Sequence, residues 1–330
     1  MFKRRTFIGT ALGAAAVSAM PRAVRAPIMT RFPLYDTHAH FYTNDFKKYP
    51  VDGSTARYGA EEVKGRIAAT PKTPDTVFPL WEDCNIAKGA AVQYGSAYLY
   101  DNSYIIDIAR QYPERLRTIC ILNENDPRTP ATIERMTQQN KIAGIRFRGY
   151  PPNGTKLHAF LSDDAAEIWQ TANKLGIAVV LMPHTRTTED RPAVLARMAE
   201  LAVKYPNVNI ILDHMAFPQV VSDTKTFGFY SGHFELGKLD NVYFKYTSLM
   251  VEQREAAHNP VQEFLAFSIA TFGSGKMMWG SDYGNTAGRL IDLTHMAIES
   301  AELLSFAEKK ALFFDTADKV HVAGGRGPKA

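Results

Sequence analysis

Two histidines separated by one residue are the first feature of the sequence that could carry out chemistry. They lie in the run Leu34–Phe41, whose apolar and aromatic residues predict a β-strand. Because side chains alternate along a strand, His38 and His40 point to the same side and can share one ion, with Asp36 behind them. Such a pair is a weak signal alone, since buried histidines often serve as hydrogen-bonded core residues. Further ligands must therefore come from elsewhere in the chain.

Other polar residues stand where later predicted strands end. His184, His214 and Asp282 each close an apolar run, and two arginines, Arg146 and Arg148, close another. In a barrel the C-terminal strand ends meet at one mouth, so these side chains would converge. Imidazole nitrogens with one carboxylate oxygen suit a divalent ion of the zinc type, with one position left for water. The other histidines fall in predicted helices or loops and are interpreted as surface or structural residues: His158, His233, His258, His295 and His321.

The elements that must position these residues alternate regularly between strand and helix. Eight strands are predicted, at residues 34–41, 89–94, 116–122, 143–148, 177–184, 208–214, 242–247 and 276–282. Helices are predicted at residues 79–87, 102–112, 129–140, 162–175, 193–205 and 261–272, with two more at the end of the chain. The pattern predicts one α/β domain, a single (βα)8 barrel of the TIM type. A doubly wound open sheet is the alternative, but no Gly-rich phosphate loop follows any predicted strand.

A long stretch without sustained periodicity follows the first strand, from Tyr42 to about Thr76. A loop of this length in a compact protein is usually functional, so it is predicted to form a lid or wall over the mouth of the site.

The two arginines indicate the charge of the substrate. Ile145 and Phe147 would pack outward against helices, which turns Arg146 and Arg148 inward. A guanidinium pair suits a carboxylate or sulfonate bound in a forked geometry, although a structural salt bridge to a carboxylate on a neighbouring strand is the alternative. Side chains that are candidates to line the same pocket are Tyr94, Asn102, Tyr150 and Tyr283.

The net charge argues against a nucleic-acid partner. The formal charge is +4, but five basic residues lie within residues 1–26, which contain no acidic residue, so residues 27–330 carry a net charge of −1. A nearly neutral body gives no electrostatic support for binding nucleic acid or an anionic membrane.

Residues 1–26 themselves have the order of an export signal. Basic residues that include the pair Arg4-Arg5 precede a weakly apolar run from Thr10 to Met20, too short to span a bilayer. The segment resembles a twin-arginine signal, with cleavage after Ala19 or Ala26 and a barrel domain at residues 27–330. The mature protein is expected in the periplasm without stable membrane anchoring; a disordered or anchoring N-terminus is the alternative. Cys84 and Cys120 are expected to be free thiols.

Taken together, the strand-end motifs resemble the amidohydrolase superfamily, in its amidohydrolase-related branch. The resemblance extends from about Leu34 to Ala317 and is carried by His38-Ala39-His40, His184, Leu212-Asp213-His214 and Trp279-Gly280-Ser281-Asp282-Tyr283. The stretches Asp36–Phe41 with Tyr49-Pro50, and Gln93 through Tyr104, are similar to the subgroup that contains 2-pyrone-4,6-dicarboxylate lactonase, sulfomuconolactone hydrolase and sugar lactonases.

The resemblance implies a role for each matching residue. The ligands of one divalent metal ion would be His38, His40, His184 and Asp282. Asp282 would also take a proton from the attacking water, and His214 would orient the substrate or share in proton transfer. Binuclear relatives carry a lysine at the end of strand four, where this chain has arginines, which implies one metal at most. Zinc is the expected ion, manganese is the alternative, and catalysis without metal, as in some lactonases of the subgroup, stays open.

The expected function is therefore that of an exported hydrolase that opens a small anionic lactone or related ester by attack of metal-activated water. A non-oxidative decarboxylase of a small aromatic or unsaturated acid on the same site is the alternative within the superfamily. A binding protein that keeps the barrel without turnover is a third reading. The expected partner is a small anionic molecule, and a homodimer is left open.

Overall fold

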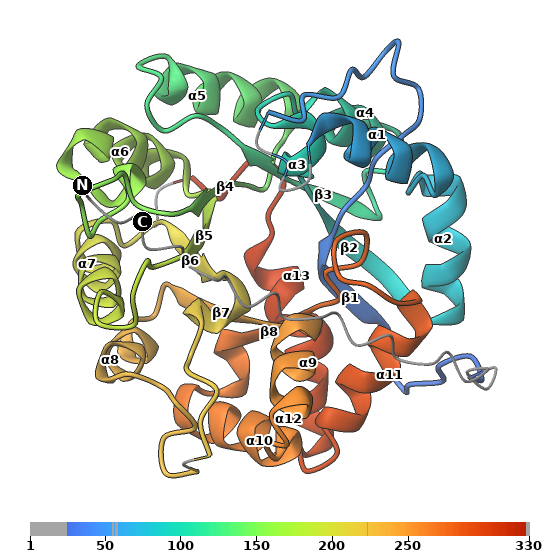
Figure 1. The fold of residues 1–330 in the computed structure, drawn as a ribbon, viewed down its shortest axis with the longest axis vertical. Helices are drawn as coiled ribbons and strands as arrows, with labels where there is room; N and C mark the ends of the chain where they lie inside the picture. The colour runs from blue at the N-terminus through green and yellow to red at the C-terminus, as the bar shows by residue number, and fades with distance from the viewer. Residues whose placement is uncertain (1–24, 55, 57–58, 223, 328–330) are drawn as a thin grey trace, which may run out of the picture.

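In the computed structural model eight parallel strands form one sheet in the order β1 to β8, so that each strand pairs with its neighbours in sequence (Figure 1). The structure describes residues 25–54, 56, 59–222 and 224–327. The predicted signal segment thus lies outside the described residues except for Arg25 and Ala26. The strands are β1 Leu34–Ala39, β2 Ile86–Val92, β3 Leu116–Ile121, β4 Gly144–Gly149, β5 Ala178–Pro183, β6 Asn209–Leu212, β7 Val242–Thr247 and β8 Met277–Gly280.

The sheet curves round so that β8 returns to β1. The Thr37 hydroxyl donates to the Trp279 carbonyl at 2.6 Å, and the His40 N–H donates to the Tyr283 carbonyl at 2.9 Å. An isolated parallel bridge pairs Ala39 with Tyr283. These contacts confirm the predicted (βα)8 barrel.

Helices surround the barrel, and one more, near the C-terminal end of the chain, packs against the core inside it (Figure 1). They are α1 Ala60–Ala69, α2 Pro74–Asp83, α3 Gly95–Tyr98, α4 Ser103–Gln111, α5 Thr129–Asn140, α6 Ala166–Leu175, α7 Arg191–Lys204, α8 Ser231–Lys238, α9 Ser248–Ala256, α10 Val261–Phe272, α11 Leu290–Ser300, α12 Phe306–Lys310 and α13 Thr316–Val320. Among the described residues no helix is long and apolar enough to cross a membrane. Cys84 and Cys120 are buried free thiols, as expected.

The second helix differs from its prediction. A helix was expected at residues 79–87, but α2 begins at Pro74, where Thr73 and Thr76 form a capping box, and ends at Asp83. Pro79 therefore lies inside the helix. Strand β2 accordingly begins at Ile86, three residues before the predicted start.

The stretch after β1 also contains more structure than a loop. Helix α1 buries Val63 and Ile67, which are four residues apart and so share one face. On the same helix, the Arg66 guanidinium lies 5.4 Å from the ring centre of Tyr94, and the Tyr94 ring lies 5.3 Å from that of His40. The segment thus approaches the strand ends, where the predicted lid or wall would stand, but through a helix.

Helix α13 contributes to the core inside the barrel. Its residues Ala317 and Val320 pack in one cluster with inward-facing strand residues such as Tyr35 and Val180. His321 follows directly, is 2% exposed, and its ring centre lies 5.7 Å from that of Tyr35, with the two rings tilted. Neither ring nitrogen of His321 has a hydrogen-bond partner in the described chain.

His321 should make the protein sensitive to acid. Burial lowers the pKa of His321 to about 3, whereas an unfolded histidine titrates near 6.5. Below pH 6.5 the unfolded chain alone takes up the proton, so stability is lost as the pH falls and the loss levels off near pH 3. At pH 5 this histidine should cost about 2 kcal/mol relative to pH 8. Urea unfolding of His321→Leu at the two pH values should show that much less acid destabilisation than the wild type. The control His258→Asn changes an exposed histidine and should lose as much stability in acid as the wild type. Equal acid destabilisation in all three proteins would contradict the role given to His321.

Candidate metal centre

Three buried ligand atoms meet at the mouth of the barrel. One ligand atom each from His38, His40 and Asp282 lies within 4.8 Å of the others. Asp282 Oδ1 lies 3.2 Å from His40 Nε2 and 3.5 Å from His38 Nε2. Tetrahedral coordination with metal–ligand bonds of about 2.1 Å places ligand atoms about 3.4 Å apart, so these three side chains fit one divalent ion.

The partners of the two imidazoles support this assignment. His40 Nδ1 lies 2.9 Å from the Val92 carbonyl oxygen, which can only accept, so Nδ1 carries a proton and Nε2 is the ring nitrogen that faces Asp282. His38 is fully buried, and neither of its nitrogens has a hydrogen-bond partner in the described chain. Burial lowers the pKa of His38 to about 3, which keeps this ring neutral at pH 7. A bare nitrogen facing a carboxylate oxygen is the arrangement that an intervening cation stabilises.

Asp282 is held by the turn that follows β8. Its backbone has a φ of 54°, and its Oδ2 accepts from Thr286 Oγ1 at 2.7 Å and Asn285 Nδ2 at 3.1 Å. Burial alone would raise the pKa of Asp282, but the facing imidazoles hold it below its usual range. The carboxylate is therefore ionised, with Oδ1 left to face the histidines.

Asp36 joins the two strands that carry these ligands. Its Oδ1 accepts from the backbone N–H groups of Ser281 at 2.8 Å and His38 at 3.0 Å, and its Oδ2 accepts from the Ser281 hydroxyl. A carboxylate behind the predicted histidine pair thus fixes the register between β1 and β8 at the level of the site.

His214 lies beside the three ligands on a strained turn. Residues His214, Met215, Ala216 and Phe217 all have φ between 51° and 57°, a left-handed turn that is unfavourable for residues with a Cβ. The His214 ring stacks on His38 at 5.7 Å, and its Nδ1 lies 2.7 Å from the Thr247 hydroxyl. Burial lowers the pKa of His214, so it is neutral at pH 7.

His184, the fourth predicted ligand, is near the three ligands but outside their cluster. Its ring lies between Tyr150, 5.0 Å away, and Phe217, 4.9 Å away, and Phe217 also contacts His214 at 5.3 Å. Its backbone is held by His158, whose Nε2 lies 2.8 Å from the His184 carbonyl oxygen. His158 is thus structural, as predicted, while the ligand role of His184 stays a prediction.

Behind His38 lies a buried charge cluster that the sequence interpretation missed. Asp213 follows β6. Its Oδ2 accepts a hydrogen bond from Arg146 Nε at 2.7 Å, and its Oδ1 forms an ion pair with Lys245 Nζ at 2.9 Å. Asp213 and Lys245 are 0% exposed. Lys245 lies on β7 between the outward-facing Phe244 and Tyr246, and that alternation is the signal that could have revealed it.

The two predicted substrate arginines consequently differ. Arg146 is in a structural salt bridge, the alternative considered for it, although its partner follows β6 and not a strand adjacent to β4. Arg148 has no ion pair with any described residue and lines a pocket of 200 Å³ with Arg146, Tyr100 and Glu124 among others. Burial, then the nearby Arg146, lowers the pKa of Arg148 to about 10, so it remains charged at pH 7. A Cβ on Gly95 would come within 2.6 Å of its guanidinium, so that glycine makes room for it.

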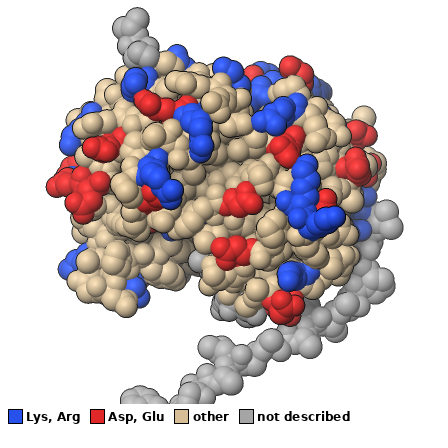
Figure 2. Space-filling view, turned by 90° about the horizontal axis from the view of Figure 1, so that it is seen from above, with Lys and Arg blue, Asp and Glu red and all other residues tan. Residues whose placement is uncertain are grey.

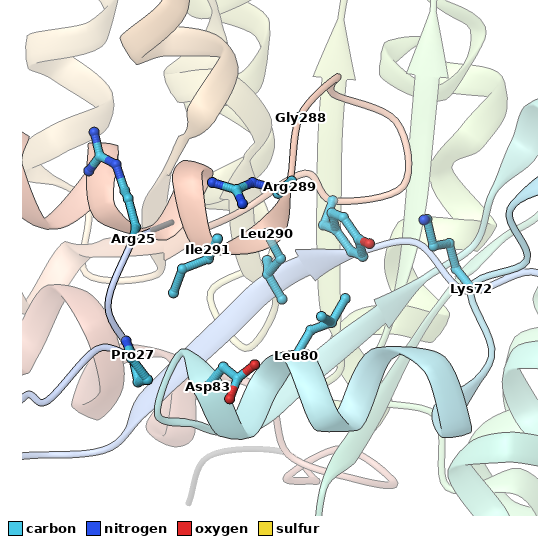
Figure 3. Close-up of a pocket in the computed structure, with 10 residues that line it drawn as sticks. Arg25, Pro27, Lys72, Leu80, Asp83, Gly288, Arg289, Leu290 and Ile291 are labelled. Carbon is cyan, nitrogen blue, oxygen red and sulfur yellow. The ribbon is translucent and has the colours of Figure 1, made fainter. Parts of the chain in front are cut away.

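Two other predicted substrate residues have structural contacts. The Asn102 side-chain amide donates to the backbone carbonyls of Tyr100, at 2.9 Å, and Ile121, at 2.8 Å. Its oxygen accepts from the Ile121 N–H. The Tyr283 ring lies under Lys72 at 4.8 Å and lines a pocket of 620 Å³ beside α2 and the start of α11 (Figure 3). None of the three metal-ligand candidates lines that pocket.

Comparison with known proteins identifies the family of the chain. The sequence pattern of the amidohydrolase family matches residues 35–320, so the chain belongs to that family. It is 25% identical over 194 residues to L-fucono-1,5-lactonase of Burkholderia ambifaria, which covers 56% of this chain and 60% of that one. The chain thus matches less than two thirds of that relative's length.

Solved structures share the fold. A protein from Pseudomonas putida provisionally assigned as a 2-pyrone-4,6-dicarboxylic acid hydrolase superposes with a TM-score of 0.60 at 18% identity, covering 88% of this chain and 98% of that one. A dihydroxybenzoic acid decarboxylase from Polaromonas sp. JS666 with bound manganese gives a TM-score of 0.62 at 14% identity, covering 88% and 97%.

Proposed function

We propose that this amidohydrolase is a metal-dependent hydrolase that opens a small anionic lactone or related ester. The observation that carries the proposal is the buried cluster of His38, His40 and Asp282 where β1 and β8 end. A pocket lined by Arg146 and Arg148 lies where β3 and β4 end, at the same end of the barrel. The lactonase relative supports the ester-hydrolase reading.

The chain's own residues have distinct tasks in this reaction. A divalent ion held by His38, His40 and Asp282 would lower the pKa of a bound water to about 7 and polarise a carbonyl. Asp282 takes the proton from the attacking water, because its carboxylate is ionised and aligned by Thr286. His214 is neutral, and its Nε2 has no hydrogen bond to a described residue, so it is free to orient the substrate or pass on the proton. Zinc suits this donor set best, with manganese as the second choice.

The test combines metal analysis with a lactone panel. The purified protein should hold about one equivalent of metal and hydrolyse an anionic 1,4- or 1,5-lactone. Activity should be lost on chelation and should return when zinc or manganese is added back. Full lactonase activity in protein free of metal would contradict the metal-dependent mechanism, and the histidines would then polarise the carbonyl directly.

The same assay separates the alternative functions. Release of carbon dioxide from 2,6-dihydroxybenzoate, with no lactone opened, would replace the hydrolase by a decarboxylase. Tight binding of a lactone without conversion, in protein loaded with metal, would indicate a binding protein.

Arg148 should set the preference for anionic substrates. The guanidinium of Arg148 lines the 200 Å³ pocket and has no ion pair with a described residue. The substitution Arg148→Met removes this charge from the pocket. Loss of one charge-assisted contact is worth about 1.5–3 kcal/mol, so KM for an anionic lactone should rise roughly 10- to 100-fold. KM for a neutral lactone should stay the same. The control is Arg128→Met, whose side chain is 84% exposed and pairs with Asp126. An equal rise in KM for neutral and anionic lactones would contradict this role.

We also propose that the protein is exported to the periplasm. Support comes from the basic and apolar order of residues 1–26. Arg25 pairs with Glu299 at 2.5 Å, which favours a mature chain that retains it and hence cleavage after Ala19. N-terminal sequencing of protein from a periplasmic fraction tests both statements.

A further inference from the structure

The charge cluster behind His38 reaches the metal ligands through a single carboxylate. Asp213 Oδ1 lies 3.5 Å from His38 Nδ1 and 2.9 Å from Lys245 Nζ, while Oδ2 lies 2.7 Å from Arg146 Nε. All of this is enclosed: Asp213, Lys245 and His38 are 0% exposed, and Arg146 is 5% exposed. The two oxygens of Asp213 therefore contact different partners: Oδ1 faces His38 and Lys245, and Oδ2 faces Arg146.

The orientation of the His38 ring depends on the oxygen that faces Nδ1. For Nε2 to bind a metal its lone pair must be free, so the single proton of the neutral ring must sit on Nδ1. The acceptor that faces that proton is Asp213 Oδ1, 3.5 Å from Nδ1, and no described residue forms a competing hydrogen bond with Nδ1. In metal centres an outer carboxylate of this kind fixes both the tautomer and the ring orientation.

We propose that Lys245 is a positioning residue that holds Asp213 Oδ1 against His38 Nδ1 and so presents His38 Nε2 as a metal ligand. The proposal rests on the metal site of the proposed function. Its structural basis is that Lys245 and His38 share one carboxylate oxygen, at 2.9 Å and 3.5 Å.

Arg146 cannot replace Lys245 in this role. It approaches from β4 and engages only Oδ2, and its Nη2 lies 3.1 Å from Met182 Sδ. Without Lys245 the carboxylate would be anchored at one oxygen and could rotate, so Oδ1 would no longer be fixed toward His38. The cation from β7 therefore sets the carboxylate plane.

The tautomer of His38 can be read without metal or substrate. In the ¹⁵N spectrum of the metal-free, ¹⁵N-histidine-labelled protein at pH 8, His38 is assigned from the signal that disappears in His38→Gln. The wild type should show a proton on Nδ1 alone. In Lys245→Met both tautomers should be populated, and in Lys245→Arg, which restores the cation, the Nδ1–H form should recover. A wild-type His38 protonated on Nε2 overturns the proposal, and this measurement needs no variant of Lys245 to fold.

Metal affinity gives the second measurement. Competition titration with zinc and a chromophoric chelator should show binding weakened 10- to 100-fold in Lys245→Met, the usual effect of losing an outer partner. The control is Lys276→Met, because Lys276 donates to two half-buried carbonyls away from the cluster, those of Gly237 and Leu239, both at 2.7 Å. Zinc affinity within twofold of wild type in folded Lys245→Met would overturn the proposal. If the wild type itself binds no zinc, the proposed function fails, and the ¹⁵N measurement still decides the tautomer.

Discussion

Replacing Asp282 by asparagine should lower kcat/KM for lactone hydrolysis at least about 10³-fold, since general-base catalysis alone contributes roughly 10²–10⁴. Asparagine keeps the size of the side chain and can still accept from Thr286, but it carries no charge and takes up no proton. The facing imidazoles of His38 and His40 lose the anion that balances a bound cation. Steady-state kinetics and metal analysis on the same preparation check the expectation.

The two roles of Asp282 can be separated by that metal analysis. Retained metal with lost activity isolates the role as base, whereas lost metal shows that the carboxylate is needed as a ligand. Thr286→Val is the matched control, because it removes one hydrogen bond to Oδ2 and leaves the charge. Its kcat/KM should fall by about 10-fold or less, in keeping with the net worth of one hydrogen bond. Wild-type kcat/KM in Asp282→Asn would eliminate the proposed base.

The barrel could be predicted from the sequence because its strands are contiguous apolar runs. All eight lie within a few residues of their predicted bounds. Helix α1 was missed because only Val63 and Ile67 of its ten residues are buried, so its apolar stripe is too narrow to stand out. Helix α2 was placed late because Pro79 looks like a helix start, whereas the capping box at Thr73 defines the real one.

The clustering of the candidate metal ligands was predictable for a related reason. His38 lies near the end of β1, and His40 and Asp282 follow the ends of β1 and β8. Barrel closure brings these strand ends together. The direction of a side chain beyond the strand is not fixed by closure, and so His184 faces Tyr150 and Phe217, outside the three-ligand group. Ion pairs across the barrel are harder still to predict.

The charge cluster illustrates that difficulty. Arg146, Asp213 and Lys245 come from β4, the end of β6 and β7, and no local pattern states that they meet. Strand alternation predicts that the Lys245 side chain points into the barrel. The role of a lysine there cannot be predicted until the carboxylate that pairs with it is known. Such clusters follow from the register of strands far apart in sequence, which composition and periodicity do not determine.

Asp213→Asn should therefore destabilise the fold by about 3–5 kcal/mol, the cost of leaving buried charges without their partner. Two cations, Lys245 and Arg146, would remain in the barrel with no carboxylate between them. Burial opposes ionisation of Asp213, but Lys245 and Arg146 hold its pKa well below the usual range, so the charge that is lost is fully formed at pH 7. Urea unfolding at pH 7 of the metal-free proteins measures the difference without a contribution from bound metal.

A second substitution shows whether the loss comes from unpaired charge. In Asp213→Asn combined with Lys245→Met, one stranded cation is removed, so the double variant should be more stable than Asp213→Asn alone, a coupling expected of residues in direct contact. The control is Asp315→Asn at an exposed pair with Lys310, where both side chains are more than 40% exposed. That change should cost less than about 1 kcal/mol. Similar losses in Asp213→Asn and Asp315→Asn, or a double variant less stable than Asp213→Asn, would mean that the buried cluster is not held together by its charges. If the double variant is the more stable one, the charges hold the cluster together. The Asp213 carboxylate then both stabilises the barrel and orients His38.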